Sequence, residues 1–376
     1  MAIGSPVPPL RGAEEAQVQG AARGQHDHRP PPPLIEQAPA DGLAAFRAIV
    51  SASGASAEAA EFLTASWRRS TTKQYLSAWR CWSEWCHGRG LVSTAVCVNT
   101  LLDYLLYLTR TKNFAWSTVG AHRSAISSML QPFTSPSVGE HPLIVRFMRA
   151  LFLSKPPTTR PRWTWDVATV LTCVRDWGLA PTLDLRRLTW KLTFLVALFS
   201  ARRVSDLSLL RISPQHFQRT ALSAVFQPAF GAKQDRPGHQ NPLIVLKKYD
   251  TDLRLCPVAH LDEYLVRSAS PDRPTNLFLT TVLPQKIAAR NTIKRWIISV
   301  LSEAGVEGSA GSTRAAAASF ALASNISLNT VLEAADWSRS TTLFRHYVRL
   351  LPPEVLAHVS ANTGRNVQDA VLDILN

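Results

Sequence analysis

Residues 188–210 read LTWKLTFLVALFSARRVSDLSLL. From Leu192 to Leu198 almost every side chain is apolar, which is typical of a helix that is buried on all its faces. Two basic residues, Arg202 and Arg203, come directly after this apolar run. The stretch therefore predicts a helix over 188–210 that lies inside a folded domain and presents cations near its end.

The residues around this stretch predict a mainly α domain with a small β-sheet. Short β-type runs at 221–226 and 242–246 flank a turn-rich segment, GAKQDRPG at 231–238, and together they indicate a hairpin or a small sheet. Apolar periodicity predicts helices at 167–177, 257–266, 291–304, 313–323, 327–335 and 340–350.

The first half of the chain predicts a helical bundle. Tyr75, Trp79, Trp82 and Cys86 follow helical spacing after a capping Ser70 or Thr71, and further helices are expected at about 98–108, 119–129 and 144–151. We interpret Trp79, Trp82 and Trp85 as core residues, because aromatic stripes at helical spacing usually pack inside. The Pro-rich stretch KPPTTRPR at 155–162 cannot continue a helix and marks a boundary.

The N-terminal end has a different composition. Residues 1–50 hold eight of the 25 prolines and a single aromatic residue, Phe46, so they bury too little apolar area to offset the entropy of ordering. The resulting division is a disordered tail at 1–54, a helical domain at 55–155, a linker at 156–162 and a second domain at 163–376.

The charge of the chain favours a polyanionic partner. Lysine and arginine number 41 against 27 acidic residues, which gives a formal net charge of +14. No apolar run is long enough for a membrane span, and the N-terminus does not have the pattern of a secretory signal. The five cysteines are odd in number and without metal-ligand spacing, so we expect reduced thiols and neither disulfides nor a structural metal site.

Three short motifs decide the functional interpretation. They are ARRVSDL at 201–207, STRAAAAS at 312–319, and DW at 336–337 followed ten residues after the tryptophan by Tyr347. In order and spacing they resemble the two arginine boxes and the nucleophile box of tyrosine recombinases, the phage-integrase-like family. STTKQY at 70–75, STV at 117–119 and RSAI at 123–126 are similar to the helical, SAM-like core-binding domain of that family. The resemblance covers about residues 60–352, and LCPV at 255–258 and LDEYL at 261–265 look most like recombinases of eukaryotic DIRS-like retrotransposons.

These residue types suit the cleavage of a phosphodiester without a metal or other cofactor. An attacking hydroxyl, cations on the non-bridging oxygens and an acid for the departing oxygen are required. Tyr347 would be the nucleophile, Arg203 and Arg314 would clamp the phosphate, and Lys233 would protonate the 5′ oxygen. The resemblance implies a covalent 3′-phosphotyrosyl intermediate and a free 5′-hydroxyl, so rejoining needs no ATP.

Three assignments keep an alternative. Arg202 competes with Arg203 for the first arginine position. Asp206 either supports the site or forms an ordinary ion pair three residues from Arg203. Trp337 either donates its indole N–H to the phosphate or packs in the core.

One position departs from the family pattern. The second box ordinarily reads His-x-x-Arg, and Gly311 stands where the histidine is expected. Because acid-base assistance of this kind contributes about 10²- to 10⁴-fold, we expect a rate deficit of that order. His346, His239 and His260 are candidate replacements, although His346 lies about 100° around a helix from its neighbour Tyr347.

The resemblance implies a site-specific recombinase or integrase that closes on double-stranded DNA as a clamp and assembles as a homotetramer in the nucleus. It takes no small-molecule substrate and does not act at a membrane. Segment 352–376 would dock either on a neighbouring subunit or on its own domain. The alternatives are a non-catalytic DNA-binding protein derived from a mobile-element recombinase, and a type IB topoisomerase. The expected DNA-binding residues of the first domain are Arg68, Arg69, Lys73, Lys112 and Arg123.

Overall fold

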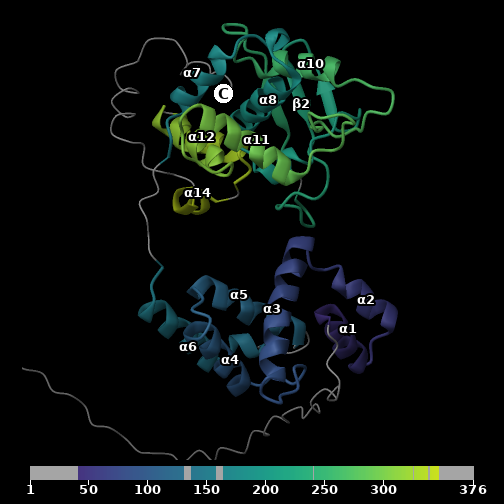
Figure 1. The fold of residues 1–376 in the computed structure, drawn as a ribbon, viewed down its shortest axis with the longest axis vertical. Coiled ribbons are helices and arrows are strands. Elements are labelled where there is room, and N and C mark those ends of the chain that lie inside the picture. The colour runs from purple at the N-terminus through teal and green to yellow at the C-terminus, as the bar shows by residue number, and fades with distance from the viewer. Residues whose placement is uncertain are drawn as a thin grey trace, which may run out of the picture. The chain divides into compact units, whose positions relative to one another are not determined.

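The computed structural model describes residues 41–130, 137–157, 164–239, 241–324, 326–337 and 339–346. The chain divides into two compact units, residues 1–159 and 160–376, which are considered separately below (Figure 1). Both are mostly helical, and the second holds a three-stranded sheet, so the predicted fold class is confirmed. Among these residues, no helix combines the length and the apolar character needed to cross a membrane.

The first unit is a bundle of helices around an aromatic core. Trp82 stacks on Trp85 with ring centroids 5.5 Å apart, meets Tyr104 edge-on at 5.0 Å, and donates its indole N–H to the carbonyl of Ser93 at 2.7 Å. Trp79 is fully buried beside them, so the interpretation of these tryptophans as core is confirmed. The elements are α1 (Gly42–Ala52), α2 (Ala57–Thr64), α3 (Arg69–His87), α4 (Val98–Arg110), α5 (Trp116–Leu130), a 3-10 turn η1 (Val138–Glu140) and α6 (Pro142–Ser154).

The predicted disordered tail is wrong at its end. Residues 42–52 form α1, which is capped by the side chain of Asp41 and buries Phe46 and Val50. The ring centroids of Phe46 and Trp67 lie 4.7 Å apart, and α1 packs against α2 and α5. The prediction averaged the composition over residues 1–50, and the eight prolines before residue 41 outweighed the short apolar helix that follows them. The preceding residues 1–40 lie outside the described part of the chain.

In the second unit, helices surround α8 and a small antiparallel sheet. The sheet has the order β1-β2-β3, and Phe226 of β2 lies between Phe217 of β1 and Ile244 of β3. Helices α8 and α10 cover β3. The elements are α7 (Val167–Asp176), η2 (Ala180–Thr182), α8 (Leu185–Ser200), α9 (Val204–Leu207), β1 (Phe217–Arg219), β2 (Ser223–Phe226), β3 (Ile244–Lys247), α10 (Pro257–Arg267), α11 (Arg290–Glu303), α12 (Ser312–Ala323), α13 (Leu328–Ala334) and α14 (Ser340–His346).

Helix α8 is the centre of this unit, as the apolar run predicts. Its residues from Leu192 to Ser200 are all buried, and α10, α11 and α12 pack against it. The prediction of one helix over 188–210 is wrong, because Ala201 adopts a left-handed conformation with φ of 47° and ends α8. The chain restarts as α9 at Val204, so both arginines of the motif lie in the break between two helices.

Two ionisable side chains lie in the core of the second unit. Lys191 on α8 is fully buried, its Nζ donates to the carbonyl of Gly178 at 2.8 Å, and burial lowers its pKa to about 7. His260 on α10 is also fully buried, and its Nδ1 lies 2.8 Å from the carbonyl oxygen of Cys256. Burial, with a smaller effect of the Lys191 charge, lowers the pKa of His260 to about 4.

We therefore expect folding stability to fall as the pH drops from 6.5 to 4. In this range the unfolded chain binds a proton at His260 that the folded chain rejects, which removes about 2–3 kcal/mol of unfolding free energy. Urea titrations at pH 7 and pH 4.5 measure the loss, and His260→Gln should show a smaller difference between the two pH values. An equal loss in the variant would assign the acid sensitivity to other groups.

Candidate functional site

The turn at residues 335–337, between α13 and α14, is the point at which the predicted site residues meet. The carbonyl of Ala335 accepts a hydrogen bond from Arg314 Nη2 at 2.6 Å, and the carbonyl of Asp336 accepts one from Gln234 Nε2 at 3.1 Å. Asp336 has a left-handed backbone, with φ of 57°. Such a conformation is strained for a non-glycine residue and persists only where surrounding contacts hold it.

Arg314 and Trp337 are brought into direct contact. Arg314 lies in the first turn of α12 and is 3% exposed, and its guanidinium carbon sits 4.1 Å from the centroid of the Trp337 ring. A cation over an indole face is attracted by the ring's electrons and is held in a fixed plane. Trp337 is itself buried, so one of its two predicted roles, core packing, is realised together with support of Arg314.

The two arginines after α8 differ sharply in their surroundings. Arg202 is buried, its Nη1 pairs with Asp336 Oδ2 at 3.2 Å, and its Nη2 donates to the carbonyl of Pro242 at 3.0 Å. Burial lowers the pKa of Arg202, and the carboxylates of Asp336 and Asp206 oppose that shift. Arg203 is half-buried, and its Nη1 has no hydrogen-bond partner in the described part of the chain. Arg202 is thus committed to internal contacts, whereas Arg203 keeps a donor for a ligand.

Asp206 contacts the backbone of Arg203 and not its side chain. Its Oδ2 accepts from the backbone N–H of Arg203 at 3.3 Å, and its Oδ1 accepts from Ser205 Oγ at 3.2 Å. Among the described residues, no ion pair joins the side chains of Asp206 and Arg203. The carboxylate caps the first turn of α9 and so fixes the backbone from which Arg203 projects.

Lys233 lies in the loop at 227–243, which connects β2 to β3. It is exposed on a turn, as predicted, and no partner within the described residues holds its ammonium group. Its neighbour Gln234 fastens this turn to the carbonyl of Asp336. The carboxylate of Asp235 accepts from the backbone N–H of Gly231 and from the side chain of Asn241, which closes the loop on itself. Lys233 is therefore carried by a loop that is tied to the 335–337 turn.

His239 joins the site from the same loop. Its Nε2 lies 3.6 Å from Asp336 Oδ1, which is an ion-pair distance but longer than a hydrogen bond, and its side chain is 23% exposed. His260, by contrast, is buried in the core and cannot serve the site. The side chain of His346 is outside the described residues.

Gly311 precedes α12 one turn before Arg314. Its backbone is helical, with φ of −75° and ψ of −21°, and the residue is exposed. A Cβ built on it would approach only Ser309 Oγ, at 3.7 Å, which is an ordinary contact. A Cβ at this position would meet no close contact, so the fold does not require glycine where the family pattern has histidine.

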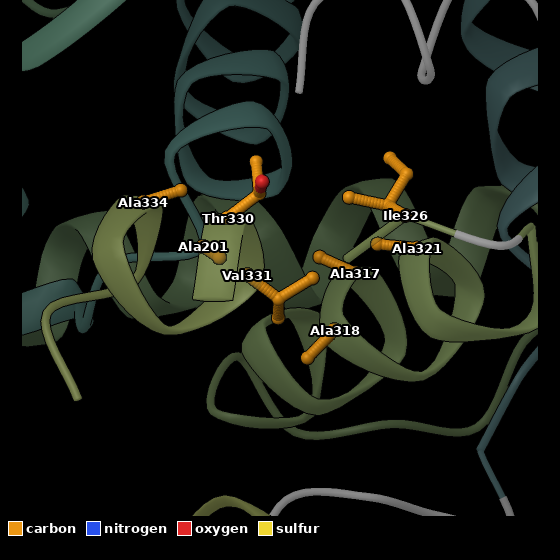
Figure 2. Close-up of a pocket in the computed structure, with 8 residues that line it drawn as sticks. All are labelled: Ala201, Ala317, Ala318, Ala321, Ile326, Thr330, Val331 and Ala334. Atoms are coloured by element: carbon orange, nitrogen blue, oxygen red, sulfur yellow. The ribbon is translucent and has the colours of Figure 1, made fainter. Parts of the chain in front are cut away.

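Small side chains explain how the elements of the site come so close together. Figure 2 shows an apolar pocket between α12, α13 and the end of α8, and small or β-branched residues line it. Because the side chains between them are small, the backbones of α12 and α13 lie close together, and Arg314 of α12 reaches the end of α13. The break after Ala201 adjoins both helices. The lining residues are Ala201, Ala317, Ala318, Ala321, Ile326, Thr330, Val331 and Ala334.

The predicted nucleophile is not described. Helix α14 ends at His346, and Tyr347 and segment 352–376 lie outside the described residues.

The predicted DNA-binding residues of the first unit lie on α3 and α5 and beyond the end of α4. Arg68, Arg69 and Lys73 are exposed at the start of α3, and Arg123 is half-buried on α5, which packs against α3. Lys112 is exposed beyond the end of α4, with Nζ 5.8 Å from the centroid of the Tyr107 ring. Arg69 and Lys73, four residues apart, lie on one face of α3.

Comparison with solved structures finds integrases and recombinases. A lambda integrase dimer bound to a COC′ core site is 14% identical, with 82% of this chain and 76% of that chain covered and a TM-score of 0.48. A lambda integrase tetramer bound to a Holliday junction is 12% identical, with coverages of 80% and 77% and a TM-score of 0.47. A pre-cleavage complex of XerH site-specific recombinase with difH substrate is 13% identical, with coverages of 78% and 79% and a TM-score of 0.49. No family model matches the chain, and no curated protein matches it significantly.

Proposed function

We propose that this protein is a site-specific DNA recombinase that cleaves and rejoins strands through a 3′-phosphotyrosyl intermediate. The observation that carries the proposal is the 335–337 turn, which gathers Arg314, the Arg202–Arg203 break and the Lys233 loop from distant parts of the sequence. Cations held in fixed positions stabilise the charge that develops on a phosphate during displacement. Arg203 and Lys233 have donors left for such a ligand.

The roles follow from the chemistry of each group. The Tyr347 hydroxyl gives its proton to water as its oxygen attacks phosphorus and forms a P–O bond, the P–O5′ bond breaks, and Lys233 gives a proton to the departing 5′ oxygen. Arg203 and Arg314 bind the non-bridging oxygens, where a planar guanidinium can meet two oxygens at once. Because the phosphotyrosyl ester keeps the bond energy, a free 5′-hydroxyl reverses the step without ATP.

The partner that fits this chemistry is double-stranded DNA, bound mainly through phosphates and hence sensitive to salt. The net charge of +14 supports it. Exchange between two duplexes involves four cleavage events, so we propose a homotetramer on DNA. We also propose a mobile-element origin of the DIRS-like type and a nuclear location, both of which rest on the sequence motifs.

Gly311 favours a second candidate, a DNA-binding protein that has lost catalysis, because it removes an imidazole at an exposed position where a side chain would fit. Such a protein would bind duplex DNA with a similar dependence on salt and would leave every strand intact.

Supercoiled plasmids with random inserts, incubated in EDTA and quenched with SDS, distinguish the two candidates. The recombinase should convert a fraction of the plasmids to nicked or relaxed forms that carry bound protein, and Tyr347→Phe should abolish the conversion while it leaves DNA binding unchanged. Salt-sensitive binding without any broken strand would establish the non-catalytic candidate.

A further inference from the structure

We propose that Phe230 is a wedge that enters duplex DNA near the cleaved phosphate, partly unstacks one base-pair step and so selects sites that have a flexible step there. This inference rests on the proposed recombinase function and adds a residue that determines which DNA is used. The observation behind it is exposure. At 89%, Phe230 is the most exposed large apolar side chain among the described residues. It lies on the 227–243 loop, three residues before Lys233.

The backbone on both sides of the Phe230 ring is held in place. Ala229 is buried, and its N–H donates to the carbonyl of Leu209 at 3.3 Å. Gly231 has a φ of 125°, and a Cβ built on it would lie only 3.3 Å from Leu209 Cδ2, so both the turn and the close packing favour glycine. Ala232 is buried again. The exposed ring therefore stands between buried neighbours that fix its position.

The loop that carries the ring is also braced against the rest of the site. The carboxylate of Asp235 accepts from the backbone N–H of Gly231 and from the side chain of Asn241. Gln234 Nε2 donates to the carbonyl of Asp336 at 3.1 Å, which ties the loop to the 335–337 turn. Because these contacts exist before DNA binds, little conformational entropy is lost when the ring is buried in the duplex.

Lys233 determines where the ring meets the DNA. In the proposed reaction its ammonium group reaches the departing 5′ oxygen, so the loop lies against the DNA at that phosphate. Three residues of extended chain span about 10 Å, and successive nucleotides of one strand are about 3.4 Å apart along the duplex. Phe230 therefore meets the bases within a few base pairs of the cleaved phosphate.

The charges beside the ring favour DNA as the occupant. Lys233 and Arg236 are both exposed, and Arg236 lines an open pocket together with Phe230. The one carboxylate of the loop, that of Asp235, is already engaged inside it. Proteins that kink DNA combine basic side chains on the duplex with an apolar side chain inserted between base pairs. An exposed phenylalanine between two cations matches that combination.

A wedge of this kind gives sequence preference through the stiffness of the DNA. A phenylalanine ring has no hydrogen-bonding group, so it does not distinguish the edges of the bases. The cost of unstacking depends on the step, and pyrimidine–purine steps such as TA and CA/TG are the easiest to kink. Phe230 should therefore place a flexible step at one position of the bound sites.

The test is permanganate oxidation of DNA bound to the full chain. The wild-type protein selects duplexes from a random-sequence pool, and permanganate then oxidises thymines whose stacking is broken. We expect one reactive step at a fixed place in the bound duplexes, enriched in TA or CA/TG. Phe230→Ala should lose most of the reactivity and the enrichment, and Phe230→Trp should keep both because an indole ring also stacks on bases. Leu222→Ala is the matched control. It removes an apolar side chain that is 70% exposed between β1 and β2, and it should change neither readout.

The possible outcomes separate the two proposals. Equal reactivity with wild type and Phe230→Ala, or bound DNA without any reactive step, would overturn the role of Phe230 and leave the recombinase function standing. A Phe230→Ala protein that changes its oligomeric state without DNA, with reactivity unchanged, would also overturn it and assign the ring to a protein interface. A reactive step that depends on Phe230, in DNA whose strands stay intact, would refute the recombinase function and keep the DNA contact of Phe230. Absence of DNA binding would overturn both.

Discussion

Replacing Arg203 with alanine is expected to lower the rate of DNA cleavage by about 10³-fold and to leave folding stability within about 0.5 kcal/mol of the wild type. The guanidinium Nη1 has no partner in the described protein, so the fold loses no hydrogen bond there when the side chain is removed. The phosphate, in contrast, would lose a charged donor in the transition state. The rate of adduct formation and a urea titration measure the two effects.

Arg202→Ala is the matched control and should behave in the opposite way. It leaves the buried carboxylate of Asp336 without its 3.2 Å partner, which is expected to cost about 3–5 kcal/mol of unfolding free energy. A stable but inactive Arg202→Ala protein, together with an active Arg203→Ala protein, would contradict the assignment and exchange the roles of the two arginines.

Restoring an imidazole at the second box is the other large expected effect. Gly311→His should raise the cleavage rate by about 10²- to 10⁴-fold over the parent protein, because it returns an acid-base group one turn before Arg314. Single-turnover cleavage by the two proteins gives the ratio.

Gly311→Ala controls for the side chain itself. It adds only the Cβ, which has an ordinary contact at 3.7 Å with Ser309, and should leave the rate and the stability unchanged. Failure of Gly311→His to accelerate cleavage over the parent protein would show that an imidazole at this position is not what the site lacks.

Local sequence pattern predicted most of the helices, and it failed at the end of α8 and at strand β1. The stripe of Tyr75, Trp79 and Trp82 marks α3 because helical spacing and burial coincide there. The break after α8 was missed because alanine ordinarily favours a helix. Ala201 nevertheless has a left-handed backbone, at a point where residues of α12 and α13 adjoin it. Strand β1 has three residues and is too short to show an alternation.

The candidate site was predicted in part. The motifs named Arg314 and Trp337. The sequence does not show that α12 and the 335–337 turn meet in space and place the guanidinium carbon 4.1 Å from the indole ring centroid. The sequence left Arg202 and Arg203 in competition, because a guanidinium's partner is set by distant residues, in this case Asp336. It named His239 as one of three candidate histidines, and only the long-range contact with Asp336 distinguishes that residue from the buried His260.

The most direct test of the central claim is to find which residue carries DNA after cleavage. Wild-type protein is mixed with a pool of nicked random-sequence duplexes and quenched in SDS, and the DNA-linked peptide is identified by mass spectrometry. The account predicts a 3′-phosphate ester on Tyr347 that is absent from Tyr347→Phe. A linkage to another residue, or tight DNA binding with no adduct at all, would contradict it.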